Sequence, residues 1–444
     1  MHHSQRYRTD QAIETWGSSY WTTICKVDSS DQCLFENSFP NTLDTAIKWT
    51  GYAANNSAEE LVFIITGDIN AMWLRDSTNQ FSFLHNDSTP VFASLYRGVI
   101  NLQARYIQTQ PYCNSFQPPP ESGVNASINS YALTDIVHPP FNNLTVFECK
   151  YELDSISSFL QLSAAYYEAT QDVEFFASAP IYAANGMVNQ SPYTFQRTTT
   201  PASETLENKG IGNPVAPGTG LVRSAFRPSD DSTIYQLFIP ANMMFSSFLN
   251  RTVPIMAAIG QSLLTSEMRT MSDSIRSAID AHAVINDAKH GTVYAYEIDG
   301  YGSYNMMDDA NIPSPLSAPL LGYTAINDPV YQATRAKLLS GDNPYFMRGP
   351  IINAIGGPHQ GPGYAWPMSK VVQILTSENE TEIYDALREI VSSTDGLGLI
   401  HESINTFNVT DWTRQWFSWA NGLFGQTILQ LNNTMPQVLQ RSYQ

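Results

Sequence analysis

The stretch Leu153-Asp-Ser-Ile-Ser-Ser-Phe-Leu-Gln-Leu-Ser-Ala-Ala-Tyr-Tyr-Glu-Ala169 determines the fold class that we predict for this chain of 444 residues. Its apolar positions recur at intervals of three and four residues, which places them on one face of a helix. These positions are Leu153, Ile156, Phe159, Leu160 and Ala164. The spacing therefore predicts a helix over residues 153–169 with one buried face.

The same periodicity predicts further helices at residues 268–281, 330–340, 381–391 and 416–431. Asn327-Asp-Pro329 precedes the second of these as a start signal, and Thr381 is the candidate N-cap of the third. Convincing strands are few, at residues 61–65 and 292–298. Because a parallel α/β fold needs strands between its helices, we expect a mainly α-helical protein.

The composition excludes several classes of protein. Only 14% of the residues are charged, against an average of about 25%, while 43% are hydrophobic and the formal net charge is −18. Disorder requires the opposite balance of charge and hydrophobicity. Nucleic acids and anionic membranes attract clusters of Lys and Arg, and the sequence has none, so we expect neither as a partner.

We expect a secreted glycoprotein. The start, Met1-His-His-Ser4, lacks the apolar core of a signal peptide, so a secreted chain would already have lost that signal. Low lysine content and the acidic balance favour an extracellular location. Nine Asn-x-Ser/Thr sequons add weak support, at Asn55, Asn86, Asn125, Asn143, Asn189, Asn250, Asn379, Asn408 and Asn432.

The four cysteines allow three pairings. Their order favours the disulfides Cys25–Cys33 and Cys113–Cys149 over four buried thiols. They lack the repeated C-x-x-C spacing of a zinc site, and the histidines lack H-E-x-x-H spacing. We therefore expect no metal and no cofactor.

Six loops combine carboxylates or amides with aromatic residues. This mixture suits sugars, because aromatic faces pack on the C–H face of a pyranose while carboxylates and arginines bind its hydroxyls. For any single loop, helix capping and core packing explain the residues better. The loops begin Thr66-Gly-Asp-Ile-Asn-Ala-Met-Trp-Leu-Arg-Asp76, Tyr151-Glu-Leu-Asp154, Arg223-Ser-Ala-Phe-Arg-Pro-Ser-Asp-Asp231, Tyr296-Glu-Ile-Asp-Gly300, Gly356-Gly-Pro-His359 and His401-Glu-Ser403.

Glycoside hydrolysis needs one protonated and one ionised carboxyl group. The adjacent Asp230 and Asp231 are candidates for the acid, because like charges in proximity resist joint ionisation. We expect Arg227 to form an ion pair with one of them, and Glu402 to be the base. The spacing leaves rivals of similar appearance, which are Asp68, Asp76, Asp154, Asp308 and Asp309.

These loops resemble the signature segments of glycoside hydrolase family 125. The segments that carry the resemblance lie between about residues 66 and 425, and they include Phe226-Arg-Pro-Ser-Asp-Asp231, Met307-Asp-Asp-Ala-Asn311 and Gly361-Pro-Gly-Tyr364. The resemblance implies an (α/α)6 barrel (a six-hairpin toroid) as a single catalytic domain over residues 1–444, with small β elements in its loops.

The resemblance also implies an activity and its residues. The activity is that of an exo-acting, inverting, metal-independent α-1,6-mannosidase that removes terminal mannose from mannan or N-glycan-type oligosaccharides. The general acid falls at Asp230, with Asp231 not excluded, and the general base at Glu402. The implied contacts of the terminal mannose are Asp68, Arg75, Asp76, Arg227, Asp308, His359, Trp366, His401 and Arg414.

Two alternatives remain open from the sequence. One is another (α/α)6 glycosidase, such as an α-1,2-mannosidase or a glucosidase. The other is a non-catalytic sugar-binding protein, which would lack one of the two carboxylates. The expected partner is a mannose-containing oligosaccharide, and we expect a monomer.

Overall fold

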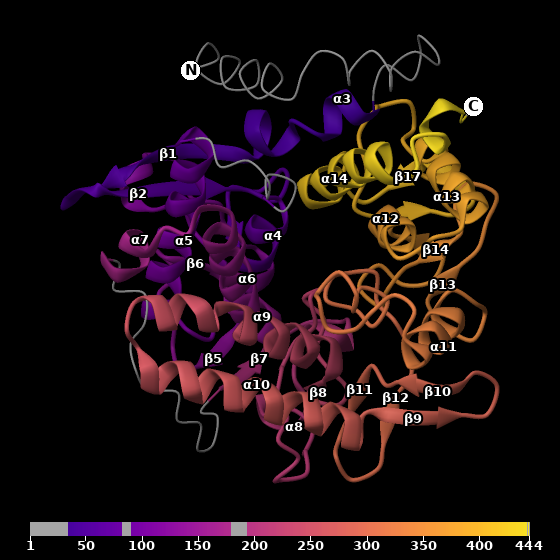
Figure 1. Ribbon diagram of the computed structural model, residues 1–444, viewed down its shortest axis with the longest axis horizontal. Coiled ribbons are helices and arrows are strands. Elements are labelled where there is room, and N and C mark those ends of the chain that lie inside the picture. Colours follow the sequence, from indigo (N-terminus) through magenta and orange to yellow (C-terminus); the bar gives the residue numbers. More distant parts are fainter. Residues whose placement is uncertain (1–33, 82–89, 179–192, 442, 444) are drawn as a thin grey trace.

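The computed structural model describes residues 34–81, 90–178, 193–441 and 443 (Figure 1). Helices form most of its regular structure, as the periodicity predicts. The helices are α3 (Leu34–Ser38), α4 (Leu74–Asn79), α5 (Pro90–Thr109), α6 (Leu153–Thr170), α7 (Val173–Ser178), α8 (Glu207–Gly210), α9 (Ile239–Ala258), α10 (Ser262–His282), α11 (Pro329–Leu338), α12 (Pro367–Leu375), α13 (Glu380–Ser392) and α14 (Ser418–Thr434).

The strands are short, and the strand pairs of the described residues are all antiparallel. They lie in small sheets of two or three strands within the connections between helices. Their bounds are β1 (Ile47–Ala53), β2 (Asn56–Ile64), β3 (Met72–Trp73), β4 (Ser115–Phe116), β5 (Ile136–His138), β6 (Val146–Glu148), β7 (Thr194–Gln196), β8 (Leu237–Phe238), β9 (Val284–Asp287), β10 (Gly291–Tyr294), β11 (Glu297–Ile298), β12 (Tyr304–Asn305), β13 (Phe346–Met347), β14 (Ala354–Ile355), β15 (Tyr364–Ala365), β16 (Ile404–Asn405) and β17 (Asn408–Trp412).

The predicted helices are all present, and one predicted cap is wrong. The helix predicted over residues 153–169 is α6, and the start signal before α11 is confirmed, because the Asp328 side chain accepts a hydrogen bond from the backbone N–H of Tyr331. The N-cap of α13 is Asn379 and not Thr381. The Asn379 side chain accepts from the N–H groups of Thr381 and Glu382, so Thr381 lies inside the first turn.

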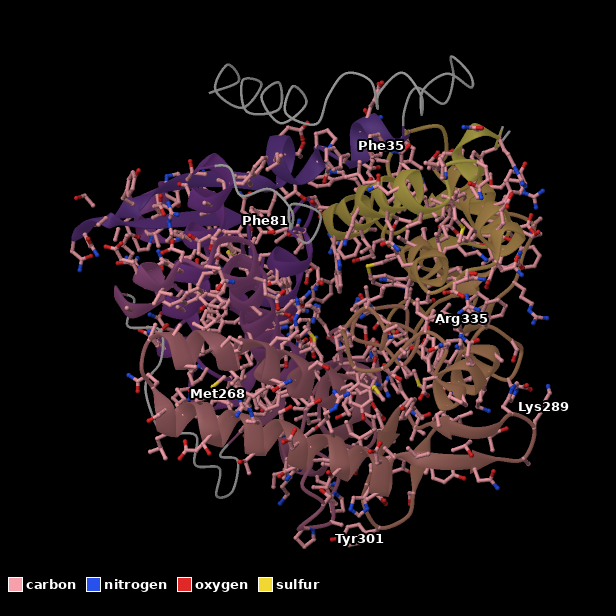
Figure 2. All side chains as sticks on the ribbon, in the orientation of Figure 1. Phe35, Phe81, Met268, Lys289, Tyr301 and Arg335 are labelled. Atoms are coloured by element: carbon pink, nitrogen blue, oxygen red, sulfur yellow. A yellow bond between two sulfur atoms is a disulfide. The ribbon has the colours of Figure 1, made fainter. Side chains whose placement is uncertain are left out.

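The chain runs once around the molecule, so that its first and last described helices meet (Figure 1). Helix α3 packs against α14, and the Ser38 hydroxyl donates to the Asn421 side chain at 2.8 Å. A Cβ at Gly425 would lie 2.9 Å from the Cα of Phe39, so the contact requires glycine there. Figure 2 shows Phe35 at this junction, where its ring stacks on that of Phe39.

The apolar core extends through this whole circuit. One cluster of buried side chains includes Leu34 and Phe39 near the first described residue and Ile428 and Leu439 near the last. At the outer edge, by contrast, Lys289 and Tyr301 project from the β-rich connections between α10 and α11 (Figure 2). No helix of the described residues is both long and apolar enough to cross a membrane.

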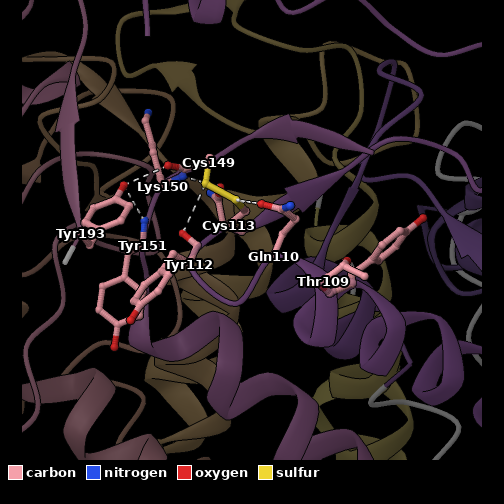
Figure 3. Close-up of a disulfide and its surroundings, with 10 residues drawn as sticks. Thr109, Gln110, Tyr112, Cys113, Cys149, Lys150, Tyr151 and Tyr193 are labelled. Carbon is pink, nitrogen blue, oxygen red and sulfur yellow. Dashed lines mark hydrogen bonds between the residues drawn. A yellow bond between two sulfur atoms is a disulfide. The ribbon is translucent and has the colours of Figure 1, made fainter. Parts of the chain in front are cut away.

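The predicted disulfide between Cys113 and Cys149 is present (Figure 3). Cys113 lies two residues before β4 and Cys149 directly follows β6, and these two strands also pair with each other. The Tyr193 hydroxyl donates to the carbonyl of Cys149 and accepts from the N–H of Tyr151, which ties a third segment to the same place. The other predicted pair, Cys25–Cys33, lies outside the described residues.

Replacement of both Cys113 and Cys149 by serine is expected to destabilise the protein. The disulfide joins residues that are 36 positions apart, and releasing a loop of that size costs about 3 to 4 kcal/mol in the chain-entropy model. Urea unfolding of the double variant should show a lower midpoint and a slope at least as steep as that of the wild type, because the released unfolded chain exposes more surface. An unchanged midpoint would contradict the expectation.

Candidate active site

The predicted site residues gather near the amino-terminal ends of helices. Arg75 and Asp76 lie in the first turn of α4, Asp154 lies in the first turn of α6, and Trp366 directly precedes α12. Residues further along α4, α6 and α12 line a cavity together with residues of α9 and α14, and they include Thr78, Gln161, Phe248, Leu375 and Leu423. The predicted site residues named above are not among those that line this cavity.

A buried arginine joins the helices α4 and α6 at the site. The Arg75 Nη1 lies 2.8 Å from Glu152 and 3.2 Å from Asp154, and its Nη2 lies 3.2 Å from Asp76. All four side chains are almost completely buried. A single cation thus holds three carboxyl groups, which leaves an excess of negative charge in a low-dielectric surrounding.

Burial, together with this excess of negative charge, raises the pKa values of the carboxyl groups around Arg75. Burial is the main cause for Asp76, and the charges of Asp230 and Glu402 add to it against the effect of Arg75, so that its pKa rises to about 6. Burial, with Asp230 and Asp154 nearby, raises the pKa of Glu152 well above its usual range. Protons are therefore available in this cluster at mildly acidic pH.

Asp230 and Asp231 lie in a tight turn with different surroundings. The backbone N–H of Asp230 donates to the carbonyl of Arg227, and that of Arg227 donates to the carbonyl of Asp231. Asp230 has a φ of +65°, in the left-handed region that aspartate tolerates better than most residues. The side chain of Asp230 is partly exposed and accepts from Asn114 at 2.9 Å, whereas Asp231 is fully buried.

Asp231 forms an ion pair with His359, on the loop between β14 and β15. The His359 Nδ1 and the Asp231 Oδ1 are 3.6 Å apart, which is longer than a hydrogen bond. Burial alone would lower the pKa of His359, but Asp231, Glu402 and Asp230 outweigh it and raise the pKa to about 10. His359 is therefore a cation at neutral pH.

Glu402 lies before β16 and is held by two side chains. Its Oε2 accepts from the Thr413 hydroxyl at 3.1 Å, and its Oε1 accepts from the Arg414 Nε at 3.3 Å. The Arg414 Nη1 also contacts the exposed Asp68. These contacts fix the carboxylate while 13% of the Glu402 side chain stays exposed.

His401 is completely buried next to the backbone of Arg414. Its ring stacks on Trp412 with centroids 4.8 Å apart, and its Nδ1 lies 3.0 Å from the carbonyl oxygen of Arg414. Burial lowers the pKa of His401, so the neutral ring donates from Nδ1 to that carbonyl, which can only accept. His401 thus supports the segment that carries Arg414.

The ion pair expected between Arg227 and one of the two adjacent aspartates is wrong. The Arg227 Nε donates to Glu297 at 2.7 Å, and the guanidinium lies over the Tyr296 ring. The charge of the Arg227 guanidinium acts on Asp231 as a longer-range electrostatic attraction. Burial would raise the pKa of Asp231, but His359, Arg227 and Ser203 together lower it. The sequence gives no local signal for the ion pair between Arg227 and Glu297, because the two residues are 70 positions apart.

Asp308 and Trp366 are both buried. The Asp308 Oδ1 accepts from the backbone N–H of Asp309, and burial together with Asp309 raises the pKa of Asp308 well above its usual range. Asp309 accepts from the Ser229 hydroxyl at 2.6 Å, which connects it to the turn that carries Asp230 and Asp231. The Trp366 ring lies 6.5 Å from that of His359.

One group of side chains has the spacing of a metal site. Ligand atoms of Glu204, Asp231 and His359 lie within 4.8 Å of one another. Glu204, however, already binds Lys150 at 3.1 Å and Arg197 at 2.8 Å. Two cations at one carboxylate, with the protonated His359 beside it, disfavour a further positive ion.

Sequence reasoning missed Asn114, Glu152 and Lys150. Asn114 follows a cysteine and carries no motif, although its amide bridges Glu152 and Asp230. Glu152 lies inside a quoted loop but has nothing in its spacing that distinguishes it from the neighbouring Asp154. Lys150 is a buried cation whose partners Glu148 and Glu204 lie on different segments. No local signal identifies contacts of this kind.

Comparisons with known proteins agree with these observations. A family model described as metal-independent alpha-mannosidase (GH125) matches residues 28–429 of the chain. The Meiotically up-regulated gene 157 protein of Schizosaccharomyces pombe (strain 972 / ATCC 24843) is 42% identical over 431 residues, which cover 92% of this chain and 84% of that protein.

A solved structure from Streptococcus pneumoniae is also similar. It is described as a metal-independent alpha mannosidase in a non-productive substrate complex with alpha-1,6-mannobiose. The identity is 32%, the TM-score is 0.77, and the match covers 90% of this chain and 93% of that one.

The pair of Asp231 and His359 predicts how stability depends on pH. Because the pKa of Asp231 is lowered, its contribution is present above its usual value of 3.8 and is lost as the pH falls further. Because the pKa of His359 is raised, its contribution is complete below the usual 6.5 and is lost as the pH rises towards about 10. The replacement His359→Gln should therefore lower the free energy of unfolding most between about pH 3.8 and pH 6.5, where both contributions are present.

We expect that cost to be on the order of 2 kcal/mol near pH 5.5 and to shrink as the pH approaches 10. Urea unfolding of wild type and variant at pH 5.5, 8 and 10 measures the difference. The same difference at all three values would show that the ion pair does not contribute.

Proposed function

The chain belongs to the metal-independent alpha-mannosidase family GH125, and we propose that it is an inverting, exo-acting α-1,6-mannosidase. One observation carries the assignment of a pair of catalytic carboxyl groups. Asp230 and Glu402, from segments far apart in the sequence, both raise the pKa values of Asp76 and His359. Two partly exposed carboxyl groups thus flank the same pair of side chains.

In the proposed reaction, Asp230 gives its proton to the glycosidic oxygen while the bond from that oxygen to C1 of the mannose breaks. A water molecule forms the new bond to C1 from the opposite face, and its proton passes to Glu402. Inversion requires room for this water between the carboxyl groups, which corresponds to about 6.5–9.5 Å. Proton exchange with solvent then restores both groups.

The surroundings favour Asp230 over Asp231 as the acid. The carboxyl of Asp230 is partly exposed, as a group that must reach a glycosidic oxygen has to be, and it lies near the buried carboxyl groups of Glu152 and Asp154. Asp231 is fully buried, with its pKa lowered. It is suited to hold His359 as a cation at the site.

The side chains with the most exposure at the site are our candidates for binding the terminal mannose. Asp68, Arg414 and His359 expose 67%, 33% and 25% of their side chains. Arg75, Arg227, Asp308 and Trp366 are buried, and we assign them the support of these groups. The α-1,6-mannobiose bound to the Streptococcus pneumoniae relative supports a substrate of that class for this chain.

We further propose that the circuit of helices is an (α/α)6 barrel and a single domain. The core cluster that joins the first and last described helices, the meeting of α3 and α14, and the predicted site residues near the amino ends of α4, α6 and α12 support this arrangement. We also propose a secreted glycoprotein. In its support, six of the seven sequons among the described residues have exposed asparagines, at positions 55, 125, 143, 250, 379 and 408.

The configuration of the first product tests the proposed mechanism. Direct attack of water on an α-mannoside yields β-mannose, which ¹H NMR distinguishes within the first minutes of the reaction. The linkage is tested with α-1,2-, α-1,3- and α-1,6-mannobiose, of which we expect the last to be hydrolysed at least about tenfold faster. Initial release of α-mannose, or a preference for another linkage, would refute the corresponding part of the proposal.

Three variants test the assignment of acid and base. Glu402→Gln should fold normally and lose about 10³-fold or more in kcat, because water is no longer activated. Asp230→Asn should lose about 10²- to 10⁴-fold on α-1,6-mannobiose but far less on α-mannosyl fluoride, whose leaving group has little need of a proton.

Asp231→Asn serves as the comparison for these two variants. It should lower stability through the pair with His359 and affect both substrates alike. If Asp231→Asn instead shows the selective loss on mannobiose, Asp231 is the acid.

A further inference from the structure

We propose that Asn114 is a positioning residue that fixes the proton of Asp230 on the oxygen that faces the substrate; this inference rests on the proposed function. Asn114 is completely buried between β4 and the disulfide. Its Nδ2 donates to the Asp230 Oδ1 at 2.9 Å and to the Glu152 Oε1 at 3.1 Å. Both protons of the amide are thereby used.

The direction of the Asn114 bond determines where the acid can carry its proton. An amide N–H can only donate, so the Oδ1 of Asp230 must present a lone pair to it. The bond therefore favours the hydrogen of a protonated Asp230 on Oδ2, because the carbonyl oxygen of a carboxylic acid is a better acceptor than its hydroxyl oxygen. Without the bond, the carboxyl group is free to rotate or to place the hydrogen on either oxygen, and fewer of its conformations can protonate a leaving group.

The backbone holds Asn114 in the orientation that this role needs. Its Oδ1 accepts from the backbone N–H of Lys150 at 3.0 Å, which prevents the amide from flipping its oxygen towards Asp230. Asn114 and Lys150 each follow one half of the disulfide between Cys113 and Cys149 (Figure 3). The disulfide and the hydrogen bond thus join the same two segments side by side.

The turn that carries Asp230 is tied to the same segment. The carbonyl of Tyr151 accepts from the N–H groups of Ala225 and Phe226, and the hydroxyl of Ser224 accepts from the N–H of Leu153. Asn114 and Asp230 are therefore fixed against one backbone, and their separation does not depend on flexible side chains.

The test compares substrates that differ in their need for a proton. Asn114→Ala should lower kcat/KM for α-1,6-mannobiose by about 10- to 100-fold, and for α-mannosyl fluoride by less than about threefold. Asn114→Leu keeps the branched shape of the side chain but has no proton to donate to Asp230, and we expect the same selective loss. The activities of this second variant test the role of Asn114 if Asn114→Ala does not fold.

Asn242→Ala is the matched control. Asn242 is also completely buried, and its Nδ2 donates only to the backbone carbonyls of Val222 and Phe238 among the described residues. Its replacement should reduce stability and change the two activities by the same factor. Thermal unfolding of each variant shows which of them are folded.

The outcomes separate this inference from the proposed function. Equal losses on both substrates in the folded Asn114 variants, with a selective loss in Asp230→Asn, would overturn the inference alone. Equal losses in Asp230→Asn would overturn the assignment of the acid, and the inference with it. A selective loss in the Asp230 and Asn114 variants, together with an unselective control, supports the inference.

Discussion

The site depends on the burial of one guanidinium against three carboxyl groups. Arg75 brings the amino ends of α4 and α6 together, and the side chains of Asp76, Glu152 and Asp154 meet around it. Removing a charge from water is costly, so this cluster exists only because each member has a partner. Burial, together with the remaining negative charge, raises the pKa values of Asp76, Glu152 and Asp154.

The proposed acid and base lie on separate segments and have different hydrogen-bond partners. Asp230 lies on a turn and accepts from the neutral amide of Asn114. Glu402 lies on a different loop and accepts from the hydroxyl of Thr413 and the guanidinium of Arg414. These different donors are the structural difference on which the two proposed roles depend.

Local patterns in the sequence were sufficient for the helices and for the segments that form the site. The periodicity over residues 153–169 and the cap signal at Asp328 depend on neighbours within a few positions, and both are confirmed. The partners of Arg227 and Asn114 depend on how distant segments pack, and the sequence could not reveal them. The disulfide pairing was predictable from the order of cysteines, whereas its position beside Asn114 was not.

The amino ends of the helices help to explain why so many carboxyl groups can be tolerated in one place. Asp76 and Asp154 occupy the first turns of α4 and α6, where unpaired backbone N–H groups carry partial positive charge. This charge is fixed to the backbone and cannot leave with a substrate or be neutralised by a proton. A site built from aspartate and glutamate thus gains a permanent counter-charge at the amino ends of α4 and α6.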